Sequence, residues 1–174
     1  MGSRFETDYD RKALTALCRA LRLSVRKKHS RRTRIFGLCV MIVGILMIAL
    51  SLKNQEPWSI SNTITAAAVL ILLVVLCRED QLNARVSQRD LLPGTDHAVS
   101  VFGPEGYETT TEAAASEFRY DAVQCICETP DYFVLFLGKR HGQLFDKHSL
   151  TGGTLEGFRA FLTEKTGKAI TNIK

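Results

Sequence analysis

Two cysteines, Cys125 and Cys127, are separated by a single residue and form the pair in this sequence with the clearest capacity for chemistry. Side chains alternate between the two faces of a β-strand, so both thiols would point to the same side. Such a pair could supply two ligands of a structural zinc site. The sequence offers no second Cys or His pair at ligand spacing, and we therefore expect buried strand residues rather than a metal centre.

The other residues with chemical potential are scattered, and they include four histidines: His29, His97, His141 and His148. No Ser/His/Asp or Cys/His arrangement is evident, and Gly152-Gly153 lacks the Lys and Ser/Thr of a phosphate-binding loop. The run from Lys139 to His141 could bind an anionic headgroup, although a solvated hairpin turn over 138–142 is the favoured interpretation. We expect no catalytic residue, no cofactor and no enzyme activity. An enzyme acting on membrane substrates would need a reactive cluster that the sequence does not contain.

The elements that position these residues include two long apolar stretches, Ile35–Leu52 and Trp58–Cys77. Neither contains a charged residue or a histidine. At about 1.5 Å per residue, each is long enough to cross roughly 27–30 Å of hydrocarbon. The rest of the chain is too polar to enclose two such helices in a soluble core, and the long polar segment before Ile35 is unlike a signal peptide. We therefore predict a transmembrane hairpin over 35–77.

Charge is distributed unevenly on the two sides of this hairpin. Residues 1–34 carry 11 Lys/Arg against 3 Asp/Glu, whereas residues 78–174 carry 11 against 14. The positive-inside rule places the basic side in the cytoplasm, and a hairpin returns the chain to that side. We expect a two-span protein of the cell (plasma) membrane with both termini cytoplasmic. The spans lack ionisable residues, which argues against a channel or a transporter.

Six basic residues directly before the first span are candidate contacts for anionic lipid: Arg26, Lys27, Lys28, Arg31, Arg32 and Arg34. Each cation near the membrane surface contributes about 1 kcal/mol of attraction. The same charges could serve only to fix topology, which is the favoured interpretation, and their position beside the membrane argues against nucleic-acid binding. Apolar residues recur at helical spacing over 10–31, with Asp8 or Asp10 as the N-cap.

The chain changes character at Pro93-Gly94, where a helical continuation over 78–92 ends. Short segments with strand character follow, separated by Gly, Pro or Asp: 99–102, 106–110, 117–122, 123–128, 132–137 and 142–145. An amphipathic helix is predicted over Leu155–Thr166, with Thr154 as its N-cap and Gly167 as its C-terminal stop. Its apolar face must cover an open face or end of the sheet.

Several segments of this region resemble the YcxB-like family of bacterial membrane proteins: Ser116–Val123, Asp131–Phe136, Leu144–Leu150 and Gly157–Leu162. The order of a basic helix, two close spans and a strand-rich tail extends the resemblance over nearly the whole chain. Asp146 stands where the family commonly has Pro, and Phe118 where Trp is common. The resemblance implies a tail similar to pleckstrin-homology-like domains, a barrel-like antiparallel sheet closed by a C-terminal helix. It implies no established biochemical role.

These features predict a membrane α+β protein with four parts: a cytoplasmic basic amphipathic helix (1–34), the transmembrane hairpin (35–77), a juxtamembrane helix and linker (78–94), and a YcxB-like β-rich domain (95–174). We expect the pleckstrin-homology-like module to bind a protein partner or a lipid headgroup at the inner face of the membrane. The alternative is an accessory subunit or regulator of a larger transport or envelope complex. Membrane lipids are the expected partners, the protein partner is unknown, and a homo-oligomer is compatible with the sequence.

Overall fold

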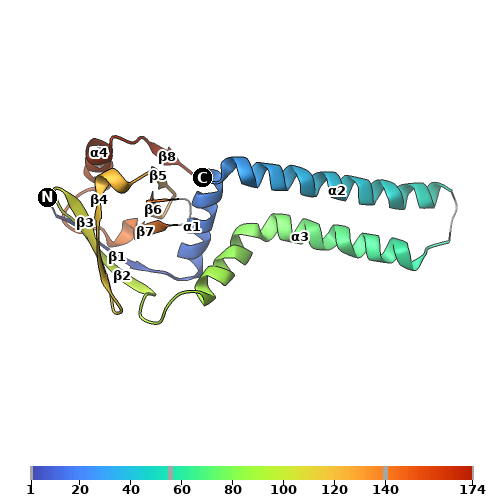
Figure 1. Ribbon diagram of the computed structural model, residues 1–174, viewed down its shortest axis with the longest axis horizontal. Helices are drawn as coiled ribbons and strands as arrows, with labels where there is room; N and C mark the ends of the chain where they lie inside the picture. Colours follow the sequence, from blue (N-terminus) through green and yellow to red (C-terminus); the bar gives the residue numbers. More distant parts are fainter. Residues whose placement is uncertain (1, 55–56, 139–140, 174) are drawn as a thin grey trace. The chain divides into compact units, whose positions relative to one another are not determined.

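The computed structural model describes residues 2–54, 57–138 and 141–173, which divide into two compact units. One unit is a β-rich domain that combines the residues up to Lys27 with those from Asn83 onward, and the other is a pair of long helices within Lys28–Leu82. The helical pair is thus inserted into the sequence of the domain (Figure 1). The expected boundaries at 34, 77 and 94 differ from this division, because N-terminal residues fold together with C-terminal ones.

The first sheet explains why the domain is discontinuous. It is antiparallel and contains, in spatial order, β1 (Ser3–Asp8), β2 (His97–Phe102), β3 (Gly106–Thr111) and β4 (Ala115–Arg119). Six residue pairs join β1 to β2, from Ser3 opposite Phe102 to Asp8 opposite His97. The strands that flank the insertion are therefore neighbours in the sheet. The sequence pattern does not predict β1.

The second sheet contains β5 (Cys125–Glu128), β6 (Tyr132–Phe136), β7 (Gly142–Asp146) and β8 (Ile170–Asn172), in the order β7-β6-β5-β8. The short strand β8, which is parallel to β5, is also absent from the sequence prediction. The strand expected over 117–122 is instead β4 followed by a 3-10 turn, η1 (Tyr120–Ala122). The other five predicted strands are confirmed to within two residues at each end.

β1 also connects the two sheets through its second edge. Arg4 and Thr151 exchange two backbone hydrogen bonds of 2.9 Å. Further along, the Glu6 N–H donates to Ser149 Oγ at 2.9 Å, and the Asp146 N–H donates to Thr7 Oγ1 at 3.1 Å. Ser149 ends a second 3-10 turn, η2 (Lys147–Ser149). The N-terminal strand thus closes one side of the two-sheet structure, and the fold is α+β.

Aromatic rings from both sheets and from α4 (Leu155–Thr166) fill the interior between them. The Phe5 ring lies 4.6 Å from Phe158 and 5.7 Å from Phe102 between centroids. Phe158 and Leu162 bring α4 into this core, which confirms the expectation that the helix covers part of the sheet structure. The predicted α4 ends are confirmed: Thr154 Oγ1 accepts from the Gly157 N–H, and Gly167 adopts a left-handed conformation with φ of 64°.

One polar atom in this core is unpaired: the Tyr107 hydroxyl is buried and has no hydrogen-bond partner among the described residues. Its ring stacks between Phe102 and Phe118, with centroid distances of 4.9 and 5.3 Å. A buried hydroxyl without a partner carries its full desolvation penalty. We therefore expect Tyr107→Phe to leave the free energy of unfolding unchanged or to raise it by about 1 kcal/mol. Urea unfolding of the full chain in micelles measures this, and a loss above 1 kcal/mol would show that the hydroxyl has a partner.

A second apolar cluster lies on the other face of the β5–β8 sheet, beneath α1 (Arg11–Leu23). Ala13 and Ala20 of the helix pack there with Val134, Phe136 and other strand residues. Of the two candidate N-caps, Asp10 is confirmed, because its Oδ1 accepts from the Ala13 N–H at 2.7 Å. The apolar face that the sequence shows before the first long apolar stretch is therefore buried against a sheet.

The inserted unit consists of α2 (Lys27–Lys53) and of most of α3 (Ile60–Arg89), which pack as an antiparallel pair (Figure 1). Both helices are long and apolar enough to cross a membrane. Their outward apolar side chains are exposed, as in Phe36 at 71% and Ile71 at 63%. Core helices of a soluble protein would bury such side chains. The two helices are therefore candidate membrane spans; as helices, α2 begins before residue 35 and α3 continues past residue 77.

Small residues allow α2 and α3 to approach closely. Gly37 and Gly44 are buried in the pair, and a Cβ on Gly44 would lie 2.8 Å from Val69 Cγ2. A Cβ on Gly37 would lie 3.2 Å from Leu76 Cδ1. Close backbone packing at glycine is a principal source of helix association in membranes.

We expect Gly44→Val to separate the two helices, because its side chain would collide with the stiff, β-branched Val69. Ser51 and Asn62, whose side chains are 3.0 Å apart, report on this packing when both are replaced by Cys. Gly44→Val should slow disulfide formation between them at least about tenfold, a change of about 1.4 kcal/mol. Mass spectrometry of the bridged peptides measures the rate. The control, Ala49→Val at an exposed position, should leave it unchanged.

Candidate functional site

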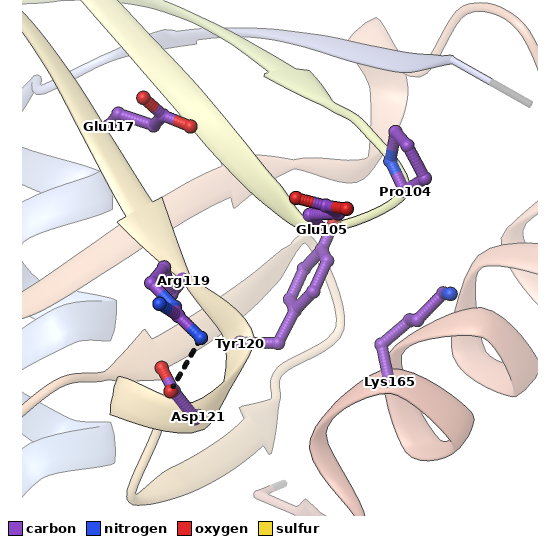
Figure 2. Close-up of a pocket in the computed structure, with 7 residues that line it drawn as sticks. All are labelled: Pro104, Glu105, Glu117, Arg119, Tyr120, Asp121 and Lys165. Atoms are coloured by element: carbon purple, nitrogen blue, oxygen red, sulfur yellow. Dashed lines mark ion pairs between the residues drawn. The ribbon is translucent and has the colours of Figure 1, made fainter.

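An open hollow of about 610 Å³ lies between the β2–β3 turn, the β4–η1 segment and α4. The turn between β2 and β3 supplies Pro104 and Glu105, and β4 with η1 supplies a neighbouring wall. Lys165, from the last turn of α4, faces them across the opening (Figure 2). The described residues that line it are Pro104, Glu105, Glu117, Arg119, Tyr120, Asp121 and Lys165.

Tyr120 fixes the geometry of this hollow. Its hydroxyl donates to the backbone carbonyls of Gly103, at 2.7 Å, and Gly106, at 3.0 Å. The phenol thereby joins η1 to the β2–β3 turn, and its ring packs edge-on against Phe161 of α4 at 5.7 Å between centroids. Burial raises the pKa of Tyr120 to about 12, so the hydroxyl stays protonated and keeps donating at physiological pH. Tyr120 is therefore a positioning residue.

Charged residues of both signs line the hollow. Three carboxylates, Glu105, Glu117 and Asp121, accompany two cations, Arg119 and Lys165. Arg119 and Asp121 form an exposed ion pair at 3.3 Å, drawn as a dashed line in Figure 2. Among the described residues that line the hollow there is no Ser, Cys or His. The wide, charged opening differs from the enclosed apolar pockets that hold small molecules.

The sequence did not point to this hollow, because its charged residues lie in turns and at strand ends without a motif. The one available signal was the run Ser116–Val123, which the family resemblance singled out and which contains four lining residues. The structure brings these together with the β2–β3 turn and with α4.

The six basic residues proposed for lipid contact lie at the start of α2, with Arg26 one residue before it. Five of them are exposed, and Arg34 is half-buried because its Nε donates to Glu79 of α3 at 3.3 Å. The first turn of α2 contains no acidic residue. The positive end of the helix dipole therefore adds to the field of these cations, an arrangement that favours a nearby anion.

Cys125 and Cys127 lie on one face of β5, as predicted, with their sulfur atoms 3.7 Å apart. Burial raises the pKa of the Cys127 thiol to about 12, which keeps it in its unreactive protonated form. The pair belongs to the apolar cluster beneath α1. Among the described residues, no group of three His, Cys, Asp or Glu side chains is arranged to hold a metal ion.

Two histidines interact with separate aspartates on the domain surface. His97 Nδ1 lies 2.6 Å from Asp8 Oδ1, and this hydrogen bond raises the pKa of His97. His148 Nε2 lies 3.5 Å from Asp131 Oδ1. His141 comes directly before β7, whereas Lys139 and Arg140, the other members of the candidate headgroup site, lie outside the described residues. Neither the His97–Asp8 nor the His148–Asp131 interaction involves a residue that lines the hollow.

One family model matches part of the chain. Residues 102–162 match the model described as YcxB-like protein. The match runs from the end of β2 into α4 and includes all four hollow residues of the β4–η1 segment. It confirms the resemblance for this part of the chain, although the sequence pattern extends the resemblance further. No curated protein and no solved structure matches the chain.

Proposed function

We propose, starting from the YcxB-like match over residues 102–162 and from the two apolar helices, that this chain is a two-span protein of the cytoplasmic membrane. The observation that most directly supports this proposal is that α2 and α3 are inserted in the sequence between two strands, β1 and β2, that pair with each other. Because β1 and β2 belong to one domain, both ends of the inserted pair return to that domain. Two antiparallel spans meet this requirement, and the 11 Lys/Arg before Ile35 favour a cytoplasmic domain.

A reporter fused after the C-terminal helix tests this topology. An enzyme that is active only in the cytoplasm should work at that position, and one that is active only outside should not. The reversed result would overturn the proposed orientation. A fusion at Asn54, beyond α2, should give the opposite pattern and serves as the matched control.

The domain itself is proposed to act as a pleckstrin-homology-like binding module rather than as an enzyme. Two four-stranded sheets with a C-terminal helix packed into their core support the comparison. Its charged hollow supports binding to a polar segment of a protein partner, since it combines ion-pairing groups with a wide opening. Copurification in mild detergent followed by crosslinking tests the idea. Glu105→Lys with Lys165→Glu should reduce recovery of a genuine partner, whereas unchanged recovery would place the partner elsewhere.

Anionic lipid headgroups are the proposed partners of the basic segment. We expect replacement of Lys27, Lys28, Arg31 and Arg32 by Gln to lower the number of anionic lipids that copurify with the protein. Four cations at about 1 kcal/mol each make this effect large at low salt. Native mass spectrometry counts the retained lipids. Arg4→Gln with Arg119→Gln, at exposed positions on the sheet, is the control. Equal lipid retention in all variants would mean that the segment acts only on topology.

An accessory role in a larger transport or envelope complex is the second candidate. The observation that favours it is the exposed apolar surface of α2 and α3, which could pack against helices of another protein as well as against lipid. Stoichiometric copurification with a multispanning protein would support this function. Purification of the chain with bound lipid but without another protein would contradict the accessory role.

A further inference from the structure

The strand β4 forms an open edge of the first sheet, and its backbone can pair with another strand. The Thr111 N–H donates to the Ala114 carbonyl in the β3–β4 turn, which sets the alternation of hydrogen bonds along the pair. By that alternation, Ser116 and Phe118 bond to β3, whereas the N–H and C=O groups of Ala115, Glu117 and Arg119 point away from it. Such an edge favours the addition of an extended segment.

The side chains along this edge indicate what the added segment should carry. Glu117 lies directly opposite Glu108 of β3, on the outer face of the sheet, at a non-hydrogen-bonded position where side chains come closest. Like charges at such positions are destabilising. Neither carboxylate has an ion-pair partner among the residues that the structure describes. A cation placed opposite Glu117 on the open side would offset this repulsion.

We propose that a second copy of this chain supplies that cation, through antiparallel pairing of the two β4 strands about Phe118. In this register Glu117 lies opposite Arg119 of the other copy, and Arg119 lies opposite the other copy's Glu117. Both residues carry outward-pointing backbone groups, so each facing pair is a hydrogen-bonded pair. The sequence Glu117-Phe118-Arg119 is thus self-complementary.

The alternative registers are less favourable. Pairing about Glu117 would place the two Glu117 carboxylates opposite each other, which adds repulsion. Pairing about Ser116 would place Glu117 opposite Ala115 and leave its charge unpaired. In the proposed register, the Arg119 N–H donates to the facing Glu117 carbonyl. Arg119 is the N-cap of η1, so one lone pair of its carbonyl is used by that turn. The second lone pair accepts from the N–H of the facing Glu117.

Self-association of this kind closes the edge at the wall of the charged hollow, which contains both Glu117 and Arg119. The contact is isologous, because the same strand pairs with itself across a two-fold axis. A five-residue strand buries little surface by itself. Confinement of both copies to one membrane raises their effective concentration, which makes a small interface sufficient. A soluble copy of the domain would lack this advantage.

Charge reversal in the full chain, reconstituted in lipid vesicles, tests the register. We expect Glu117→Arg or Arg119→Glu alone to weaken dimer formation about tenfold, as each changes two symmetric attractions into repulsions. The double variant Glu117→Arg/Arg119→Glu should restore wild-type association. Energy transfer between labelled copies, measured against dilution in lipid, gives the equilibrium. Glu112→Arg, the same charge change in the β3–β4 turn, should have no comparable effect.

A crosslink provides an independent measurement. A mixture of Glu117→Cys and Arg119→Cys chains should form an intermolecular disulfide between these two positions faster than either variant alone. Facing residues in a hydrogen-bonded pair have Cα atoms about 5.5 Å apart, within disulfide range. A monomeric wild type in vesicles, or a dimer insensitive to both single reversals, would overturn the proposal. Loss in the single variants without recovery in the double would also overturn it.

Discussion

Replacing Phe5 by Ala should lower the free energy of unfolding of the β-rich domain by about 3–5 kcal/mol, a large part of the stability of a domain of this size. The ring is fully buried although Phe5 is the fifth residue of the sequence. It contacts four other phenylalanine rings, from β2, β6, β7 and α4: Phe102, Phe133, Phe145 and Phe158. A cavity at this point would loosen both sheets and the helix together.

The four tyrosines all belong to the β-rich domain, whereas the single Trp, Trp58, belongs to the inserted unit, two residues before α3 begins. Near-ultraviolet circular dichroism of the tyrosines during urea unfolding in micelles therefore follows the domain. Val101→Ala, on the solvent side of β2, is the matched control and should change stability by less than about 1 kcal/mol. Equal losses for Phe5→Ala and Val101→Ala would show that β1 does not close the domain. Far-ultraviolet measurement of helix content then confirms that the inserted helices persist.

β1 shows why sequence patterns could give the α4 helix and most strands but not the domain boundary. Three of its residues face the interior, and two of them, Ser3 and Thr7, are polar. A strand with one inward apolar residue lacks the alternation by which strands are recognised. Its partner β2 follows both long helices in the sequence, so the pairing of β1 with β2 becomes visible only in the folded structure. β8 escaped prediction similarly, because it has only three residues and pairs in parallel.

The basic segment and the charged hollow differ in the same way, in whether their residues are close together in the sequence. The basic segment could be proposed as a candidate site from sequence because its cations are concentrated beside an apolar stretch, a pattern contained in contiguous sequence. The hollow was not recognisable, because the turn at 104–105, the β4 strand and Lys165 converge only after folding. Cys125 and Cys127 were placed on one face of a strand from spacing alone, since β geometry fixes that relation locally.

Replacing Glu128 by Gln should lower the stability of the domain by about 3 kcal/mol at pH 7, because it removes the counter-charge of a buried ammonium. Glu128 and Lys147 are 9% and 8% exposed at their side chains, and Lys147 Nζ donates to Glu128 Oε1 at 2.6 Å. Arg159 of α4 donates to the same carboxylate through Nε and Nη2 at 2.7–3.1 Å. The Phe133 ring lies under both cations.

The pH dependence of stability distinguishes a charge effect from a packing effect at this cluster. The hydrogen bonds from Arg159, followed by those from Lys147, lower the pKa of Glu128 below its ordinary value of 4.5. A lowered pKa in the folded state means that the carboxylate stabilises the fold above about pH 4.5 and that this contribution disappears as pH falls through the folded-state pKa. The wild type and Glu128→Gln should therefore differ most near neutrality and converge in acid. A difference independent of pH would contradict the ion-pair explanation.

The double variant Glu128→Gln/Lys147→Met provides the decisive comparison. It removes the buried positive charge together with its partner, and replacing a buried ion pair by an apolar side chain is often neutral or stabilising. We expect it to recover about 1–3 kcal/mol relative to Glu128→Gln alone. The control is Glu6→Gln, which removes a carboxylate paired with Arg4 at 2.7 Å on the exposed sheet surface and should change stability by less than about 1 kcal/mol. If Lys147→Met failed to rescue Glu128→Gln, the loss would come from the bonds to Arg159 and hence from the docking of α4.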